Sequence, residues 1–210
     1  MQQTDQEKFW DSDFGKEYTE RNAFGIDELE ELYIKEYGIS RSDLNKNFLG
    51  DLPIENILEV GCNYGLQLQL LQKQGFRNCY GIDIQRYAIE KAHKSAPDLN
   101  VIYGSALDLP FKDKYFDLVF TAGVLIHISP DDIRKAITEI YRVSKKYIYG
   151  LEYYNEDYHE IEYRGNQKRL WKTDFCRMYQ DLFPDLTLIK EQKLHITGTG
   201  NTDCVFMLSK

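Results

Sequence analysis

The sequence lacks the patterns that mark membrane proteins, secreted proteins and metal-binding proteins. Its longest apolar runs are too short to span a bilayer, and residues 1–8 are polar, so we expect neither a membrane span nor a signal peptide. The 4 cysteines form no C-x-x-C pair, which favours reduced thiols and a cytoplasmic protein. The 4 histidines are widely spaced, so no metal site is expected.

Positive charge is also scarce. The chain has 26 Lys and Arg against 34 Asp and Glu, a net charge of -8 at pH 7. Sequence-independent binding to nucleic acid depends on clustered Lys and Arg, so this balance counts against a nucleic-acid partner. No internal repeat or low-complexity linker is evident. A length of 210 residues with 42% hydrophobic residues suits a single α/β domain with a sizeable core.

Strand and helix patterns alternate along the chain, which predicts a mostly parallel sheet with helices on both faces. Strands are expected near 57–60, 79–83, 100–103, 116–121, 146–151, 186–192 and 203–209. Helices are expected near 65–74, 85–95 and 130–144, with a short one after residue 173. Ser129 and Pro130 have the residue types of a helix start. An earlier helix should begin with Asp27 as its cap and end at Gly38.

The most informative stretch is Ile-Leu-Glu-Val-Gly-Cys-Asn-Tyr-Gly at 57–65, followed by Gly-Ile-Asp at 81–83. It predicts a strand, a tight turn, a helix and a second strand that ends in a carboxylate, a framework that holds an adenosine ligand. The dinucleotide fingerprint G-x-G-x-x-G is broken here, because Asn63 replaces its middle glycine and Gly65 comes one residue early. Glu59 would repel a pyrophosphate, but it suits a positively charged ligand without phosphate, such as S-adenosylmethionine.

At these residues the chain resembles the class I S-adenosylmethionine-dependent methyltransferases, whose first motif reads acid-x-Gly-x-Gly-x-Gly. The resemblance implies that Glu59, Gly61 and Gly65 line the cofactor and that Asp83 binds its ribose. It also implies a Rossmann-like, doubly wound sheet of seven strands with the last strand antiparallel. Asn63 departs from the motif, but asparagine tolerates the left-handed backbone that glycine would adopt there. Asn63 is therefore included among the expected cofactor-binding residues. The alternative is a generic Rossmann-like turn in an NAD-dependent oxidoreductase.

The third predicted strand leads into a polar turn at 103–109. In the family, an acid often follows the glycine of this turn and contacts the adenine amino group, whereas here Ser105 has that place. We expect Ser105 and Ala106, with Ile84 from the preceding strand end, to contact the cofactor. For Asp108, an adenine contact and an ordinary turn are left open.

Residues 116–128 resemble the fourth methyltransferase motif, a buried strand followed by an active-site loop. Residues 121–125 should pass beneath the cofactor, with Ala122 in contact. Asp117 begins the strand, far from its functional end, and is interpreted as structural. His127 is the leading candidate for a general base, since the unperturbed pKa of histidine lies near neutrality. The alternative is a packed histidine that orients the loop.

The segment 152–172 follows the fifth strand, so it emerges at the edge where open α/β sheets bind ligands. It is long, aromatic and highly charged, which predicts an acceptor-binding loop. His159, Glu152 and Tyr154 are further candidate catalytic bases. The expected acceptor-binding residues are Tyr153, Tyr163, Arg164 and Lys172. An arginine there is suited to a carboxylate or phosphate; the alternative is a surface loop whose charges pair with one another.

Aromatic residues also gather at 9–22, before the first long helix. They predict either a lid that excludes water from methyl transfer or a staple that packs the N-terminus onto the sheet. Tyr18 and Arg21 of this stretch are included among the cofactor-binding residues. We therefore expect a cap or lid over 1–50 and a methyltransferase domain over 51–210.

The flanking segments refine the resemblance. Phe-Gly-x-x-Tyr-x-x-Arg-Asn at 14–22, Glu-Val-Gly-Cys-Asn-Tyr-Gly at 59–65, and Glu-Tyr-Tyr-Asn with Tyr-Arg-Gly within 152–165 are similar to methylases associated with pseudaminic acid biosynthesis. This resemblance implies an enzyme of bacterial surface-glycan biosynthesis. Its acceptor would be an acidic, nonulosonic sugar, the nucleotide-activated form or a precursor, methylated at oxygen or nitrogen. A non-catalytic protein that binds S-adenosylmethionine and acts through a partner is the further alternative.

Overall fold

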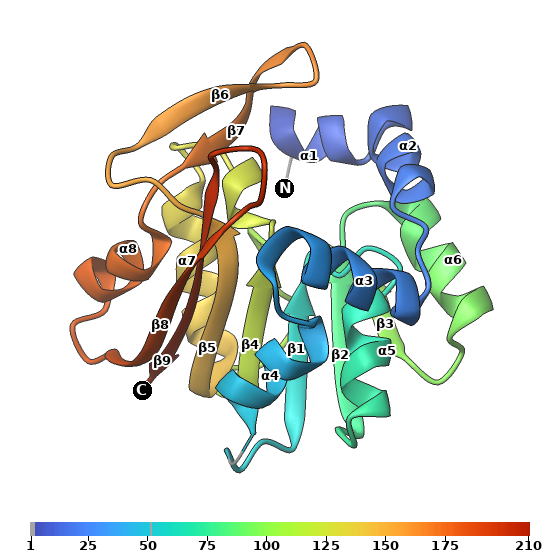
Figure 1. Ribbon diagram of the computed structural model, residues 1–210, viewed down its shortest axis with the longest axis vertical. Helices are drawn as coiled ribbons and strands as arrows, with labels where there is room; N and C mark the ends of the chain where they lie inside the picture. The colour runs from blue at the N-terminus through green and yellow to red at the C-terminus, as the bar shows by residue number, and fades with distance from the viewer. Residues whose placement is uncertain (1–2, 51) are drawn as a thin grey trace.

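A computed structural model describes residues 3–50 and 52–210 of the chain. Seven strands form one sheet in the order β3-β2-β1-β4-β5-β9-β8, visible in Figure 1. The strands are β1 (Asn56–Val60), β2 (Asn78–Asp83), β3 (Asn100–Tyr103), β4 (Phe116–Ala122), β5 (Ser144–Tyr153), β8 (Thr187–His195) and β9 (Thr202–Ser209). The first five run parallel, and β9 is antiparallel to both of its neighbours. The predicted Rossmann-like sheet of seven strands, with the last one antiparallel, is confirmed.

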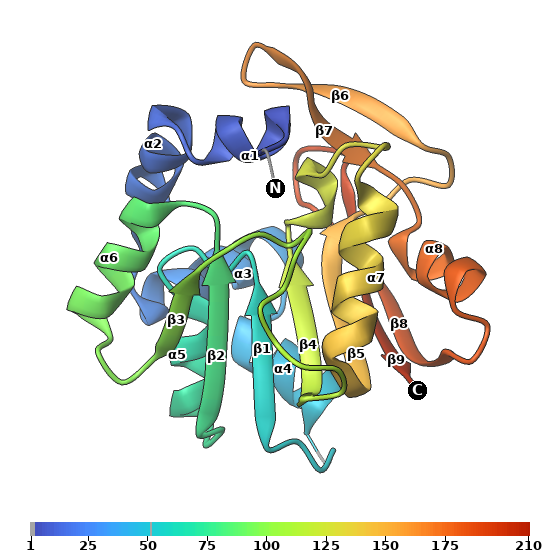
Figure 2. The same cartoon turned by 180° about the vertical axis from the view of Figure 1, so that it is seen from behind.

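Helices cover both faces of the sheet and its ligand-binding edge (Figures 1 and 2). They are α1 (Asp5–Trp10), α2 (Asp13–Arg21), α3 (Ile26–Tyr37), α4 (Arg41–Leu49), α5 (Leu66–Lys73), α6 (Arg86–Ser95), the 3-10 helix η1 (Leu125–His127), α7 (Ile133–Val143) and α8 (Phe175–Leu182). Both views show α1 and α2 beyond the carboxyl ends of the central strands. None of the helices in the described part of the chain is long and apolar enough to cross a bilayer.

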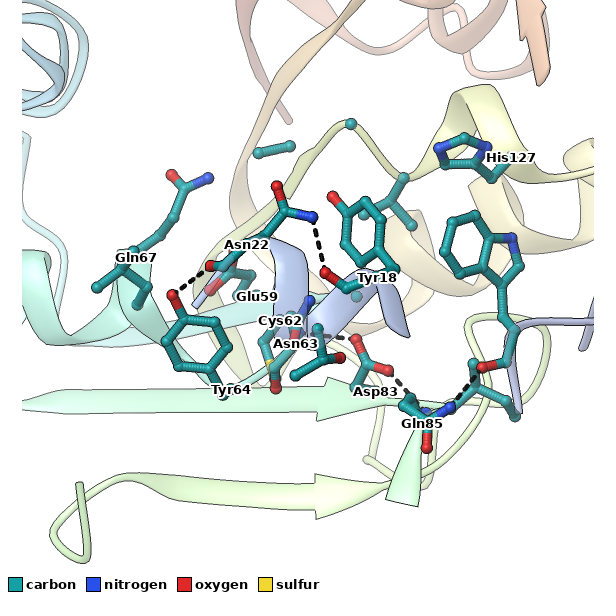
Figure 3. Close-up of a pocket in the computed structure, with 18 of the residues that line it drawn as sticks. Tyr18, Asn22, Glu59, Cys62, Asn63, Tyr64, Gln67, Asp83, Gln85 and His127 are labelled. Carbon is teal, nitrogen blue, oxygen red and sulfur yellow. Dashed lines mark hydrogen bonds between the residues drawn. The ribbon is translucent and has the colours of Figure 1, made fainter. Parts of the chain in front are cut away.

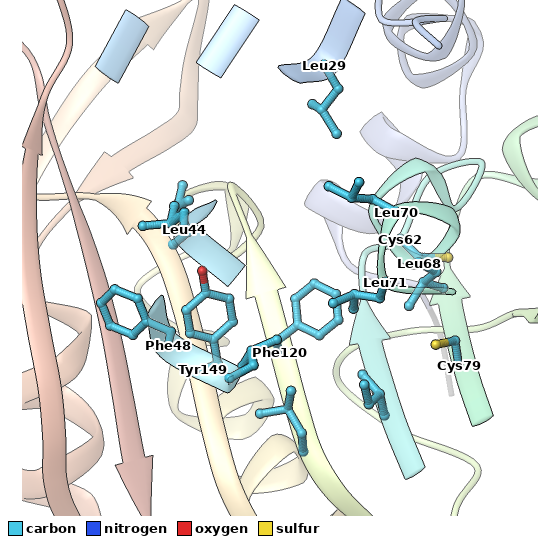
Figure 4. Packing of buried hydrophobic residues seen from close by; sticks show 14 of the residues in the cluster. Leu29, Leu44, Phe48, Cys62, Leu68, Leu70, Leu71, Cys79, Phe120 and Tyr149 are labelled. Atoms are coloured by element: carbon cyan, nitrogen blue, oxygen red, sulfur yellow. The ribbon is translucent and has the colours of Figure 1, made fainter. Parts of the chain in front are cut away.

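The sheet separates two hydrophobic cores. On one face, Leu44 and Phe48 of α4 and Leu68 of α5 pack toward Phe120 and Tyr149 of the sheet (Figure 4). On the other face, α7 buries isoleucines at three- and four-residue spacing together with Phe175 and Tyr179 of α8. Both faces of the central strands are therefore covered by helices. The pocket described below opens at the carboxyl ends of these strands.

Two predicted helix starts are wrong in detail. Gly25, not Asp27, caps α3, because the Gly25 N–H donates to the Glu28 carboxylate at 2.6 Å. Gly38 ends the helix in a left-handed conformation, with φ 72°, as predicted. Helix α7 begins three residues later than expected, because the Ser129 hydroxyl donates to the Asp132 carboxylate at 2.8 Å instead of capping the helix.

The predicted acceptor loop is largely a β-hairpin. After β5, the strands β6 (His159–Tyr163) and β7 (Asn166–Lys172) form a separate antiparallel pair that projects beyond the sheet near α1 (Figure 1). Arg164 and Gly165 form its turn with φ values of 50° and 78°, the pattern of a two-residue type I′ turn. The expected boundary between the cap and the following domain falls at residue 51, which lies outside the described residues.

A close approach of β5 and β9 brings two pocket residues together. A Cβ added at Gly150 would lie 2.2 Å from Cζ of Phe206, so the ring occupies the space that any larger residue would need. This contact belongs to an antiparallel register in which Tyr153 is opposite Asp203 at the ligand-binding edge. Gly150 therefore helps to set the position of those two side chains.

We predict that Gly150→Ala lowers the free energy of unfolding by about 1–3 kcal/mol, the usual cost of overpacking a core. Urea denaturation measures this loss. Gly25→Ala is the matched control: its added Cβ would meet nothing closer than the Glu28 carboxylate at 3.6 Å, so the cost should stay at or below about 1 kcal/mol. Equal losses in the two variants would contradict the packing role of Gly150.

Candidate functional site

A pocket of about 370 Å³ opens at the carboxyl ends of the central strands. Its floor comes from the ends of β1, β2, β4, β5 and β9, and its cover comes from α1, α2 and α3. Figure 3 shows Asp83, Asn63 and Glu59 on one side of the pocket and His127 on another. Ligands of open α/β sheets bind at this edge.

The turn after β1 is held in left-handed conformations, with φ values of 74° at Gly61, 50° at Asn63 and 77° at Gly65. The left-handed backbone predicted for Asn63 is confirmed. Gly61 and Cys62 donate N–H bonds to the Ile82 carbonyl at 2.8 and 3.1 Å, so the turn is fixed to β2. Gly65 lies outside the pocket lining, and a Cβ there would be 2.7 Å from Leu99. Its place in the motif therefore reflects backbone conformation and packing.

Asp83 connects the turn to the N-terminal segment. Its carboxylate accepts N–H bonds from Asn63 and Gln85, both at 2.7 Å (Figure 3). Burial raises the pKa of Asp83, and the backbone N–H groups around it act in the opposite direction. The Gln85 side chain then donates to the carbonyls of Trp10 and Ser12, both at 2.9 Å. The end of β2 thus holds both the glycine turn and the beginning of α2.

The charged groups of the lining are acidic: Glu7, Glu59, Asp83 and Asp203, while no Lys or Arg of residues 3–50 and 52–210 lines the pocket. Glu59 is 3% exposed, and its Oε2 has no hydrogen-bond partner. Burial raises the pKa of Glu59 well above its ordinary value, although the buried guanidinium of Arg41 opposes the shift. Such a pocket favours a ligand that brings positive charge or hydrogen-bond donors.

Ser105, Ala106 and Ile84 line the pocket next to Asp83. The Ser105 hydroxyl donates to the Glu7 carboxylate and accepts the Leu107 N–H at 3.0 Å. A carboxylate therefore is present in this region, but it comes from α1 and not from the turn after β3. Asp108 forms an isolated bridge with Ser105 and lies outside the lining, which favours the ordinary-turn interpretation.

The N-terminal segment covers the pocket and is bonded to the glycine turn. Trp10 and Tyr18 line the pocket, and the Tyr64 hydroxyl donates to the Asn22 carbonyl at 2.7 Å and accepts the Phe24 N–H at 2.9 Å. The segment thus has features of both the lid and the staple that its sequence predicts.

Arg21, by contrast, does not reach the lining. Its guanidinium pairs with Glu17 at 3.5 Å and lies 5.7 Å from the centre of the Phe14 ring. Its contact with the cofactor therefore stays a prediction, one that the pocket lining does not support.

His127 lies where the hairpin, the N-terminal segment and the loop after β4 meet. Its Nδ1 is 2.7 Å from the Arg169 carbonyl, which can only accept, so Nδ1 carries the hydrogen. Its ring centre is 4.6 Å from that of Trp10 and 4.9 Å from that of Tyr163. Burial lowers the pKa of His127 to about 4, so the ring is neutral at pH 7. The geometry suits the packed histidine that orients a loop better than a strong base.

The other three candidate bases lie outside the pocket, and His159 is exposed on β6. Glu152 is 1% exposed and accepts the N–H groups of Val124 and Ile126, at 3.0 and 3.4 Å, so it holds the loop after β4. Tyr154 lies beneath the Lys193 ammonium, 3.4 Å from its ring centre. None of these residues lines the pocket, and the Glu152 carboxylate already accepts backbone N–H groups, so a catalytic role for them stays a prediction that this geometry does not support.

Among the expected acceptor-binding residues, Tyr153 lines the pocket, and Ala122 of the neighbouring β4 does so as well. Lys172 donates to Asn201 and lies 5.2 Å from the centre of the Tyr153 ring, just behind the wall. Tyr163 packs on His127, and Arg164 is exposed in the hairpin turn, so neither lines the pocket. The segment predicted as one acceptor loop thus has three parts: Tyr153 in the pocket wall, Tyr163 in the hairpin and Arg164 in the hairpin turn.

Sequence reasoning missed Glu7, Tyr37 and Asp203, all of which line the pocket. Each is a polar residue inside or beside a regular element, without a motif around it. Asp203 is the charged residue next to the start of a strand with an apolar centre, and that is the one local signal of the three.

The comparisons agree with the fold and the glycine turn. Residues 58–147 match the family model described as "Methyltransferase domain". An O-methyltransferase of Aspergillus nomiae, rstn1, is 33% identical over 95 residues, which are 42% of this chain and 41% of that protein. An uncharacterized methyltransferase of Synechocystis, sll0829, is 30% identical over 102 residues, 45% of this chain and 48% of that protein. The chain thus spans less than half the length of these curated relatives.

Among solved structures, the Burkholderia thailandensis 1,6-didemethyltoxoflavin-N1-methyltransferase, with bound 1,6-didemethyltoxoflavin and S-adenosylhomocysteine, aligns with a TM-score of 0.70. The alignment covers 100% of this chain and 92% of that one at 14% sequence identity, so it concerns the fold. The match to residues 58–147 agrees with the methyltransferase resemblance of the glycine turn. The chain therefore contains a methyltransferase domain over those residues, built on the Rossmann-like sheet described above.

Proposed function

We propose that the whole protein is an S-adenosylmethionine-dependent methyltransferase that modifies oxygen or nitrogen of a small polar acceptor. The observation that carries this proposal is the acidic lining of the pocket: four carboxyl side chains and, among the described residues, no lining cation. The sulfonium and ammonium groups of S-adenosylmethionine are attracted to such a pocket, whereas the pyrophosphate of a dinucleotide is repelled. This contrast favours the methyltransferase over the NAD-dependent alternative.

The residues present fit the cofactor. Each oxygen of the Asp83 carboxylate accepts one backbone N–H and keeps a lone pair for a ribose hydroxyl. The unpartnered Oε2 of Glu59 suits the ammonium group, which would lower the raised pKa of that carboxyl again. Ser105 and Glu7 are assigned to the adenine side. The remaining wall is assigned to Tyr18, Gly61, Asn63, Ile84, Ala106 and Ala122.

S-adenosylmethionine supplies a methyl group that already carries its leaving group, so the protein mainly orients the acceptor and excludes water. Trp10 and Tyr18 cover the pocket. The Glu152 carboxylate fixes the loop that passes beneath the pocket. This loop runs from β4 to η1 and includes Ala122 and Val124, both of which line the pocket.

For the acceptor, we propose an acidic, nonulosonic sugar or its nucleotide-activated form in bacterial surface-glycan biosynthesis. Support comes from the resemblance of the flanking segments and from the exposed cations of the hairpin, Arg164 and Lys168, which lie outside the acidic pocket. A carboxylate or phosphate would bind to those cations, while the atom to be methylated enters the pocket. The names of the relatives above include an O-methyltransferase and an N-methyltransferase, so either atom is compatible with the fold.

A methyl-transfer assay tests the proposal directly. S-adenosylhomocysteine release is measured with nonulosonic acids, their nucleotide-activated forms and neutral hexoses as acceptors. A product heavier by one methyl group with an acidic sugar supports the proposed acceptor. Turnover of neutral hexoses alone would contradict the acidic acceptor, and failure to bind S-adenosylhomocysteine at all would contradict the methyltransferase itself.

We predict that Asp83→Asn weakens the affinity for S-adenosylhomocysteine by roughly tenfold or more, the scale of one hydrogen bond to a charged group. The amide would also turn an N–H donor toward the Asn63 or Gln85 N–H, where the carboxylate accepts. Isothermal titration calorimetry measures the affinity. Asp108→Asn makes the same chemical change outside the lining and should leave it unchanged; equal affinities in both variants would count against the role of Asp83.

A second prediction concerns His127. His127→Asn can still donate to the Arg169 carbonyl through its amide, so we expect the rate of methyl transfer to stay within a few-fold of the wild type. His127→Ala loses that bond and the ring between Trp10 and Tyr163, and should be slower than His127→Asn. An essential general base would instead cost roughly 10²–10⁴-fold in both variants. Single-turnover rates with saturating cofactor distinguish the two roles.

A further inference from the structure

Asp203 is a pocket carboxylate that the proposed cofactor contacts leave unused. It lies at the start of β9, opposite Tyr153 of β5, and it lines the pocket while being 1% exposed. Its Oδ2 accepts the Tyr37 hydroxyl at 2.7 Å. Its Oδ1 is buried and has no hydrogen-bond partner. Buried polar atoms are rarely left in that state, so the unpartnered oxygen points to a ligand group that completes it.

The surroundings of Asp203 leave that oxygen ready to accept. Lys172 is the cation beside it, but its ammonium donates to Asn201, and no ion pair joins Lys172 to Asp203 within the described residues. Burial raises the pKa of Asp203 to about 6, with Glu36 raising it further and with Tyr37 and Lys172 opposing the shift. The group is therefore ionised at neutral pH and keeps its full capacity to accept hydrogen bonds.

Asp203 lies far along the sheet from the residues assigned to the cofactor. Asp83 is the last residue of β2 and Asp203 is the second residue of β9, four inter-strand steps away in the sheet order. At ~4.8 Å per step, the two carboxylates lie roughly 19 Å apart along the sheet edge. With the ribose on Asp83 and the ammonium on Glu59, the far end near Asp203 and Tyr153 is the space left for a second ligand.

We propose that Asp203 binds the methyl acceptor by accepting a hydrogen bond from an amine, amidine or hydroxyl group, with Tyr37 holding the carboxylate in place. This inference rests on the proposed methyltransferase function and narrows its substrate class. The part of the acceptor that enters the pocket is neutral or positively charged, since an anionic group there would face Asp203. Any carboxylate or phosphate of the acceptor remains outside, toward the hairpin.

Two small probes of nearly equal shape and opposite charge test this inference: acetamidinium, which donates hydrogen bonds, and acetate, which accepts them. Each is titrated into protein saturated with S-adenosylhomocysteine. We expect acetamidinium to bind roughly tenfold or more tightly than acetate, and Asp203→Asn to remove most of that difference, the scale of one hydrogen bond to a charged group. The affinity of Asp203→Asn for S-adenosylhomocysteine should equal that of the wild type.

Asp181→Asn is the matched control, because it makes the same chemical change on an exposed face of α8. It should bind acetamidinium as the wild type does. The inference is overturned if acetate binds as tightly as acetamidinium, if acetamidinium does not bind, or if Asp203→Asn leaves its affinity unchanged. If the wild type does not bind S-adenosylhomocysteine, the proposed function fails first and this inference fails with it.

If Asp203→Asn does not fold, Tyr37→Phe replaces it, because this variant keeps the carboxylate but removes the donor that holds Oδ2. The acetamidinium affinity should then fall less than tenfold, with the S-adenosylhomocysteine affinity unchanged. For any acceptor that is turned over, Tyr37→Phe should raise the KM for the acceptor more than it lowers kcat. An unchanged KM together with unchanged acetamidinium binding would overturn the assignment.

Discussion

The pair of N–H bonds accepted by Asp83 is the interaction on which the site depends. One bond fixes the left-handed turn at Asn63, and the other fixes Gln85, whose side chain holds the N-terminal segment. A carboxylate at the end of one strand therefore organises the loop of the neighbouring strand and the cover above both. This arrangement requires a half-buried carboxylate, and the surrounding backbone N–H groups offset the cost of removing it from water.

The pocket has two regions, whose residues suit different ligands. The region over β1 and β2 has strand ends, a glycine turn and carboxylates that suit a ligand with a sulfonium and an ammonium group. The region over β5 and β9 has tyrosines and Asp203, close to the hairpin whose cations remain outside. Negative charge inside and positive charge outside would orient an acceptor that carries a carboxylate, because only one of its ends is accepted within the pocket.

Local patterns predicted the sheet well and the pocket in part. The strand positions and the left-handed Asn63 follow from apolar runs and from the backbone that a tight turn requires. The roles of Glu152 and Tyr154 did not follow, because the sequence does not tell which face of a strand end turns toward the pocket. Asp203 was missed for another reason: its partner Tyr37 is 166 positions away, so the pair exists only once α3 packs against the antiparallel pair β8 and β9.

The attachment of the N-terminal segment has a consequence for how this protein can change during evolution. Gln85 bonds to the carbonyls of Trp10 and Ser12, and Tyr64 bonds to the main chain of Asn22 and Phe24. All of these anchors are main-chain atoms of the segment, which every amino acid supplies except for the Phe24 N–H, which proline lacks. Lining side chains that make none of the anchoring bonds, such as Tyr18, can therefore be replaced without detaching the cover from the rest of the site.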